Sequence, residues 1–170
     1  LYILQSRRLM IEVVKKLNLT TNYTTQRGLR QQDLYKQSPI EVSFINDDNK
    51  QGRSLVVTPL NDQRVELSDF QDKYLSRREQ RMELTAAFGD TISTPVGQLV
   101  VEKSLYLDST YYNKAINVTK STLEATANSY RKRVQSGIVN KQASVVSISM
   151  NAASPRRAED VINTLIEVYN

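Results

Sequence analysis

The chain has 170 residues, of which 39% are hydrophobic and 24% are charged, a composition that supplies a hydrophobic core and excludes intrinsic disorder. It contains no histidine and no cysteine, which excludes imidazole acid–base catalysis, histidine-activated nucleophiles, thiolate metal sites and disulfides. The net charge of +5 comes from 23 basic and 18 acidic residues in scattered positions, a mild balance that indicates no nucleic-acid-binding face by itself.

Three segments carry the apolar periodicity of amphipathic helices: 6–17, 121–135 and 154–170. The first ends near Asn18. The second begins at a predicted capping box, in which Ser121 and Glu124 satisfy the first turn, and Gly137 follows as a stop. The third begins at Ser154, whose hydroxyl can cap free amides, and Pro155 suits the first helical position.

Short strands are predicted between the helices, at 40–44, 55–58, 64–67, 98–102, 114–119 and 143–150. Segment 71–87 allows two interpretations, a helix or a loop that leads into a strand near 82–86. Because strands 114–119 and 143–150 each precede a helix, we expect helices packed mainly on one face of a mixed or antiparallel sheet. The predicted fold class is therefore α+β, a two-layer domain that spans residues 1–170.

Neither end of the chain lies at a residue that normally starts or stops a helix. The sequence begins at Leu1, just before the first predicted helix, and it ends at Asn170 without interrupting the last apolar pattern. We therefore expect the sequence to be a domain excised from a longer protein.

Nine tyrosines raise the possibility of stacking on sugars or bases. Tyr106, Tyr111 and Tyr112 fall in one predicted loop, where they are candidate contacts for a glycan. Tyr130 and Tyr169 instead fall on the apolar faces of predicted helices, which predicts core positions for both.

Arg156 and Arg157 lie in the first turn of the last predicted helix, where positive charge opposes the helix dipole. Neutralisation by Glu159 and Asp160 on the same helix is one explanation. The alternative is contact with carboxylates of a neighbouring subunit, since arginine suits bidentate contacts, and this makes Arg156 and Arg157 candidate interface residues.

The triplet Arg131, Lys132 and Arg133 falls at a predicted helix C-terminus, where the helix dipole favours cations, so dipole compensation is preferred over a polyanion site. Acidic pairs at 47–48 and 159–160 fall in a turn and in a first helical turn, which indicates structural roles. No glycine-rich phosphate-binding spacing occurs. The sequence therefore predicts no catalytic residue, cofactor or metal ligand.

Three groups of residues follow one another with the order and spacing of a known family. They are Ile3-Leu4-Gln5-Ser6-Arg7 with Val13-Val14 and Leu17-Asn18-Leu19; Phe88-Gly89-Asp90 with Thr94-Pro95-Val96-Gly97; and Ser144-Val145-Val146-Ser147-Ile148-Ser149 with Ser154-Pro155, Ala158, Asn163 and Tyr169. Together they resemble the periplasmic domain of bacterial chain-length determinants, the polysaccharide co-polymerases, which include the extracytoplasmic part of tyrosine autokinases. The resemblance spans nearly the whole chain.

The resemblance implies a domain on the periplasmic face of the bacterial inner membrane, held between two membrane-spanning helices of the parent protein. It implies homo-oligomeric rings that govern the length or export of a surface polysaccharide together with the polymerase or export machinery. It implies no enzymatic site or cofactor in this chain, and where a tyrosine kinase domain exists it is cytoplasmic. The 170 residues include neither membrane segment nor the long helical extension of the family.

Two other functions stay open at this level. A basic nucleic-acid-binding α+β domain is the first alternative, although no RNP-like Lys/Arg-Gly-Phe pattern occurs. The second is an enzyme that uses carboxylates alone, which would require two convergent acidic groups in a deep pocket.

Overall fold

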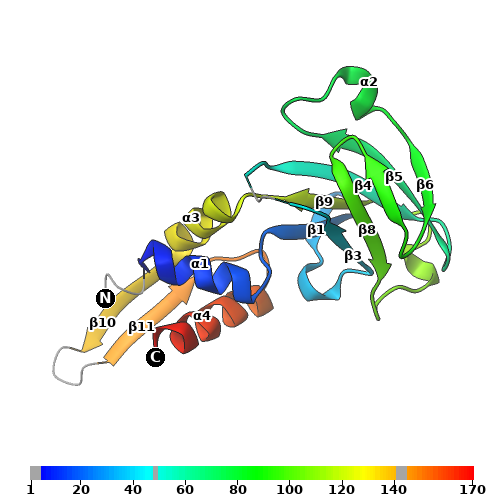
Figure 1. Cartoon of the computed structure of the whole chain (residues 1–170). Coiled ribbons are helices and arrows are strands. Elements are labelled where there is room, and N and C mark those ends of the chain that lie inside the picture. Colours follow the sequence, from blue (N-terminus) through cyan, green and yellow to red (C-terminus); the bar gives the residue numbers. More distant parts are fainter. Residues whose placement is uncertain (1–4, 48–49, 141–144) are drawn as a thin grey trace. The chain divides into compact units, whose positions relative to one another are not determined.

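The computed structural model describes residues 5–47, 50–140 and 145–170, and the chain forms two compact units (Figure 1). The helical unit comprises Leu1–Thr20 and Thr122–Asn170, and the strand unit comprises Thr21–Ser121. In the described part there are four α-helices and eleven strands, and all sheets are antiparallel. The predicted α+β class is confirmed.

The helical unit contains three helices and a β-hairpin, namely α1 (Arg7–Lys16), α3 (Leu123–Arg133), α4 (Pro155–Tyr169), β10 (Val134–Asn140) and β11 (Val145–Met150). Helix α1 packs against both α3 and α4, and the two hairpin strands contact α3 and α4 (Figure 1). The buried apolar side chains of this unit are Met10, Val13, Val14, Leu19, Ala127, Tyr130, Val134, Val161 and Leu165. All of them except Leu19 fall on the stripes that predict the three helices.

Each of these helices begins at a hydroxyl side chain. The Ser154 hydroxyl accepts the Arg157 N–H at 3.2 Å, and Pro155 is the first helical residue, as predicted. The predicted capping box at Ser121 is wrong, because Thr122 is the N-cap of α3 and accepts the Ala125 N–H at 3.1 Å.

Helix α3 is shorter than predicted. It ends at Arg133, and Val134 takes an extended conformation with φ −77° and ψ 125°. The chain continues as strand β10, in which Gly137 pairs with Ser147 and does not act as a helix stop. Val134 is nevertheless buried. Its predicted core position is therefore correct, but it belongs to strand β10 and not to the predicted helix.

The strand unit consists of two sheets. The first has the order β2-β1-β9-β4-β5-β6, with β1 (Thr21–Arg27), β2 (Arg30–Asp33), β4 (Arg53–Pro59), β5 (Arg64–Gln71), β6 (Leu84–Ala87) and β9 (Ile116–Lys120). The second has the order β3-β8-β7, with β3 (Ile40–Phe44), β7 (Thr91–Thr94) and β8 (Gly97–Lys103). Short helical turns are η2 (Tyr35–Gln37), α2 (Arg77–Gln80) and η3 (Ser109–Tyr111).

Both sheets contribute to one hydrophobic core. Its members are Leu34, Ile40, Val42, Leu55, Val57, Val65, Leu67, Phe70, Ile92, Val96, Leu99, Val101, Ile116 and Val118. Alternation explains the pattern, because along β5 the side chains of Val65 and Leu67 are buried while Glu66 between them is not. The strand unit is thus layered sheet on sheet.

The internal arrangement differs from the expected single sheet covered by helices. Strand β9 belongs to the six-stranded sheet, whereas β11 pairs only with β10 within the described residues. For segment 71–87 the strand alternative is correct, since the single turn α2 precedes β6.

Candidate functional site

The candidate glycan contacts lie in the loop 104–115 of the strand unit, which its own hydrogen bonds hold in place. The Ser104 hydroxyl donates to the Ser38 carbonyl and accepts the Tyr106 N–H at 3.0 Å. At the other end the Asn113 N–H donates to the Pro59 carbonyl at 2.7 Å. The loop is therefore anchored on both sides of its tip.

Asp108 fixes the middle of this loop. Its carboxylate accepts the Thr110 N–H at 2.8 Å and also the Thr110 hydroxyl. These two hydrogen bonds, the one from the hydroxyl foremost, hold the pKa of the Asp108 carboxyl below its usual range, and Lys114 adds a smaller effect in the same direction. The fully exposed carboxylate thus serves the loop conformation.

The three predicted tyrosines are not equally accessible. Tyr106 is 46% exposed and follows Leu105, which is fully exposed, whereas Tyr111 and Tyr112 are half-buried. The structure brings the three residues into one ordered loop, and their contact with a glycan stays a prediction. Tyr130 is buried as expected, but the core position predicted for Tyr169 is wrong, because that side chain is 50% exposed.

The two candidate interface arginines have different surroundings. Arg156 is exposed, and its contact with a partner subunit stays a prediction. Arg157 is only 4% exposed, and its Nη1 donates to the Tyr130 hydroxyl at 2.8 Å. The Arg157 guanidinium is therefore an internal group of the helical unit and not an exposed contact for a neighbouring subunit.

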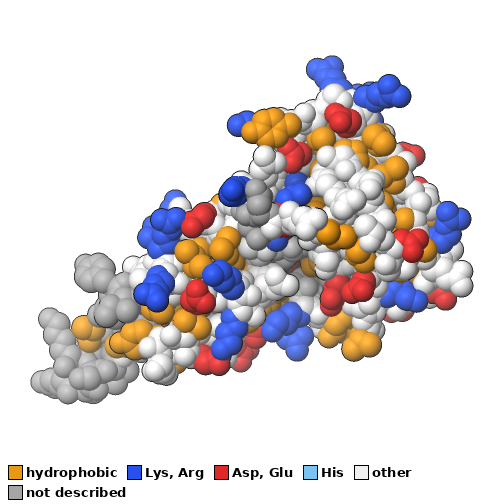
Figure 2. Space-filling model, viewed as in Figure 1, with side chains coloured by type: hydrophobic (Ala, Val, Ile, Leu, Met, Phe, Trp, Pro, Cys, Tyr) orange, Lys and Arg blue, Asp and Glu red, His pale blue; other side chains and the backbone are white. Residues whose placement is uncertain are grey.

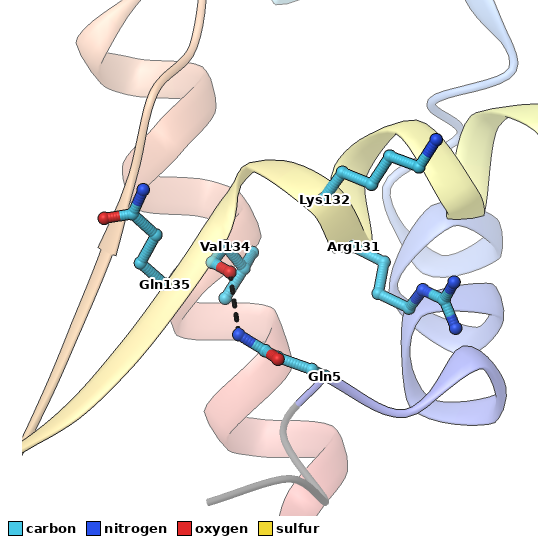
Figure 3. Close-up of a pocket in the computed structure, with 5 residues that line it drawn as sticks. All are labelled: Gln5, Arg131, Lys132, Val134 and Gln135. Carbon is cyan, nitrogen blue, oxygen red and sulfur yellow. Dashed lines mark hydrogen bonds between the residues drawn. The ribbon is translucent and has the colours of Figure 1, made fainter.

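An open pocket of about 420 Å³ lies in the helical unit at the junction of α3 and β10 (Figure 3). It is lined by Gln5, Arg131, Lys132, Val134 and Gln135. The Gln5 Nε2 donates to the Val134 carbonyl at 3.1 Å, which fixes the segment before α1 against the start of β10. Figure 3 shows the Arg131 and Lys132 side chains extending in different directions from the last turn of α3.

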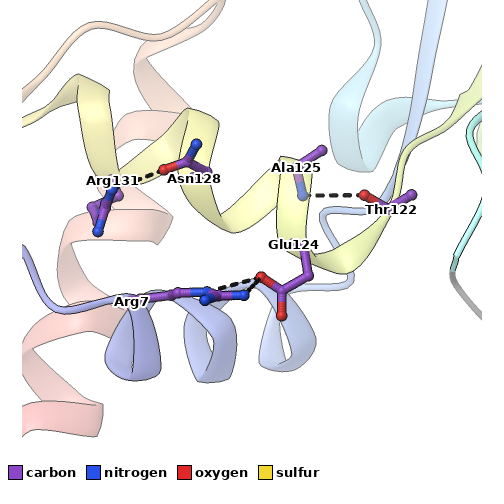
Figure 4. A network of polar contacts seen from close by, with 6 residues as sticks. All are labelled: Arg7, Thr122, Glu124, Ala125, Asn128 and Arg131. Carbon is purple, nitrogen blue, oxygen red and sulfur yellow. Dashed lines mark hydrogen bonds and ion pairs between the residues drawn. The ribbon is translucent and has the colours of Figure 1, made fainter.

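Other charged side chains of this unit form ion pairs. Arg7 pairs with Glu124, Lys16 pairs with Glu167 at 2.6 Å, and Figure 4 shows the Arg7–Glu124 contact between α1 and α3. The Arg131 Nη2 donates to the Asn128 amide oxygen at 2.9 Å. Within the described residues, no carboxylate forms an ion pair with Arg131 or Lys132.

A buried ionic cluster lies in the strand unit. Asp47 pairs with Arg53, and its other oxygen lies 3.1 Å from Lys120 Nζ. The Arg53 Nη1 also donates to the Val96 carbonyl at 2.8 Å, and the guanidinium carbon lies 4.8 Å from the centre of the Phe44 ring. Since these residues come from both sheets and their turns, the cluster ties the sheets together.

Sequence reasoning weighs an anion site at Arg131, Lys132 and Arg133 and prefers dipole compensation, but it misses the pocket, because Gln5 is far from these residues along the chain. It misses the ionic cluster because the cluster residues are far apart along the chain. The acidic pair at 47–48 is predicted to be structural, and the contacts of Asp47 agree; Asp48 lies outside the described residues. Figure 2 shows basic and acidic side chains intermixed on the visible face. No acidic cluster suited to a metal ion occurs in 5–47, 50–140 or 145–170.

Comparisons with known proteins leave this geometry as the main source of functional inference. No protein-family model matches the chain, and no curated protein matches it either. None of the helices in the described part of the chain has both the length and the apolar character needed to cross a membrane.

Proposed function

We propose that this chain is an extracytoplasmic scaffold domain of a bacterial inner-membrane polysaccharide co-polymerase, which governs the chain length or export of a surface polysaccharide. The observation that supports this proposal most is that α1 and α4 pack together in one unit, although the whole strand unit lies between them along the sequence. In such a protein, the membrane segments before and after the domain would attach to the same body.

The proposed role is geometric and requires no covalent chemistry from these residues. Copies of the domain would assemble on the periplasmic side of the membrane and, with the polymerase or export machinery, set where the growing polymer is held and released. Exposed Arg156 is the candidate for contact between copies. The ordered loop that carries Tyr106 is the candidate for contact with the polymer, because an anchored aromatic loses little conformational freedom on binding.

The charge distribution gives no specific support to a nucleic-acid-binding function. Nucleic-acid-binding domains present unpaired cations along one face. Here Arg7, Lys16, Arg53 and Lys120 pair with carboxylates, and on the face that Figure 2 shows basic side chains are intermixed with acidic ones.

Deletion of the gene in the source bacterium tests the proposal. We expect a changed length distribution or a loss of surface polysaccharide on gels, restored by the intact gene. Complementation with Tyr106→Ala should restore the polymer incompletely. Tyr74→Ala is the matched control, since Tyr74 is 71% exposed on another loop of the same unit, and it should restore the polymer fully.

Two results would contradict the proposal. One is an unchanged surface polysaccharide after deletion. The other is a parent gene that encodes no hydrophobic segments of about 20 residues on the two sides of this domain.

A further inference from the structure

We infer that the pocket lined by Gln5, Arg131, Lys132, Val134 and Gln135 binds an acidic sugar through the carboxylate of a uronate unit. The choice of an anion follows from the pocket itself. The choice of a sugar rests on the proposed function.

The charge of the lining favours an anion. Arg131 and Lys132 contribute two positive charges, none of the five lining residues is acidic, and no ion pair within the described part neutralises either cation. Arginine presents a planar set of donors that matches a carboxylate. One Nη of Arg131 is used by Asn128, which leaves further donors on the guanidinium for a ligand.

Compensation of the helix dipole does not account for both cations. The C-terminus of a helix carries a partial charge of about −0.5, which is smaller than the charge of one cation. Arg133 already lies in the last turn of α3, with its guanidinium 5.4 Å from the centre of the Tyr130 ring. Arg131 and Lys132 therefore leave an excess of positive charge at the pocket.

The neutral lining residues suit sugar hydroxyl groups. Gln5 uses its amide nitrogen on the Val134 carbonyl, and within the described residues its amide oxygen accepts no hydrogen bond (Figure 3). The Gln135 amide likewise forms no side-chain hydrogen bond in the described part. Amides both donate and accept, as hydroxyl groups do, so these two side chains can bind a polyol beside the charged group.

The size of the pocket favours a sugar over a small inorganic ion as the ligand. A volume of about 420 Å³ lies within the range of small-molecule sites, which is about 300–1,000 Å³. A water molecule occupies about 30 Å³ of liquid. The pocket thus has room for a saccharide unit around the carboxylate.

The test is a titration of the 170-residue chain followed by amide chemical shifts, with three probes. They are a glucuronate-containing disaccharide, its neutral glucose counterpart and inorganic phosphate. We expect the glucuronate disaccharide to shift the amide signals of residues 131–135 and to bind at least tenfold more tightly than the other two. The double variant R131Q/K132Q should lose this binding at least tenfold.

The matched control is R8Q/K15Q, which removes the same number of charges from exposed positions of the same unit and should bind as the unmodified chain does. If phosphate bound as tightly as the glucuronate disaccharide, the pocket would be a simple anion site. If the neutral disaccharide bound as tightly, the carboxylate would not contribute to binding. Either result, or no shifts at 131–135, overturns the inference.

The titration and the gene deletion fail independently. Glucuronate binding together with an unchanged surface polysaccharide would keep the site and contradict the proposed function. A changed polysaccharide without glucuronate binding would contradict only the site.

Discussion

The guanidinium of Arg157 lies buried against Tyr130 and donates to its hydroxyl at 2.8 Å, which joins the first turn of α4 to α3. A positive charge in the first turn of a helix opposes the dipole, and burial adds a desolvation cost. Hydrogen bonds inside the helical unit offset these costs. Arg157 is thus a structural residue that sequence reasoning places at a surface.

Removing the acceptor should destabilise the chain. Tyr130→Phe keeps the ring but leaves the buried Arg157 donor without this hydroxyl, so we expect a loss of about 1–3 kcal/mol in the free energy of unfolding. Urea denaturation measures it. Arg156→Ala, on the exposed neighbour, should change stability by less than about 0.5 kcal/mol. Equal effects of the two variants would contradict the internal role of Arg157.

The ionic cluster of the strand unit should depend on its shared carboxylate. Asp47→Ala removes the carboxylate that pairs with both Arg53 and Lys120. The side chains of these two cations are only 13% and 11% exposed. We expect a loss of about 3–5 kcal/mol by chemical denaturation. Glu124→Ala breaks the exposed pair with Arg7 and should cost at most about 1 kcal/mol. A small effect of Asp47→Ala would show that the cluster does not tie the sheets.

The turn between β7 and β8 should require glycine at position 97. Gly97 has φ +111°, and a Cβ there would lie 3.1 Å from Arg53 Nη1. Gly97→Ala should therefore cost about 1–3 kcal/mol in thermal or urea unfolding. The control is Gly52→Ala, where an added Cβ meets only the Lys120 carbonyl, at 3.6 Å, without a positive φ. Its effect should be clearly smaller than that of Gly97→Ala.

Tyr23 should make stability fall at alkaline pH. Burial raises the pKa of its hydroxyl above the ordinary 10.0, the hydrogen bond from Val42 opposes this, and Glu41 adds to the increase. Above pH of about 10 the unfolded chain loses the Tyr23 proton while the folded chain retains it. The contribution of Tyr23 to the free energy of unfolding is therefore fully present below pH of about 10, and it decreases as the pH rises through the raised pKa.

Urea midpoints between pH 7 and 11 measure this dependence. Tyr23→Phe should cost about 1 kcal/mol at pH 7, because the Val42 N–H loses the hydroxyl that accepts it at 2.9 Å, and it should reduce the alkaline decrease. Tyr74→Phe, at a side chain that is 71% exposed, should leave the decrease unchanged. An alkaline decrease that persists in full in Tyr23→Phe would contradict the assignment.

Helices α1 and α4 are predictable from the sequence because local signals and core contacts agree. Ser6 and Ser154 cap them. Met10, Val13 and Val14 of α1 and Val161 and Leu165 of α4 lie on the predicted apolar stripes and are buried, whereas Ile166 and Tyr169 at the end of the α4 stripe are exposed. Strand β1 has no such pattern. Its residues are mostly polar, and what defines it is pairing with β9, for example between Thr21 and Lys120, which no local window contains.

The start of β10 and the two sites were missed for related reasons. Val134 continues the helical spacing from Tyr130, so its extended conformation is decided by pairing with Met150. Glu124 fits a capping box by its spacing, yet it binds Arg7, which is 117 positions away. The pocket residue Gln5 and the cluster residue Lys120 likewise acquire their roles from distant segments. Chemistry built on such contacts leaves no local pattern.

Where the chain enters and leaves the strand unit, Thr21 faces Lys120 on adjacent strands. The two crossing points are therefore neighbours, and closing the remaining chain between Thr20 and Thr122 would need only a short linker with a small entropic penalty. The molecule is in this sense modular. Evolution or an engineer can exchange the inserted half for another fold whose termini are close, without redesigning the half that receives it.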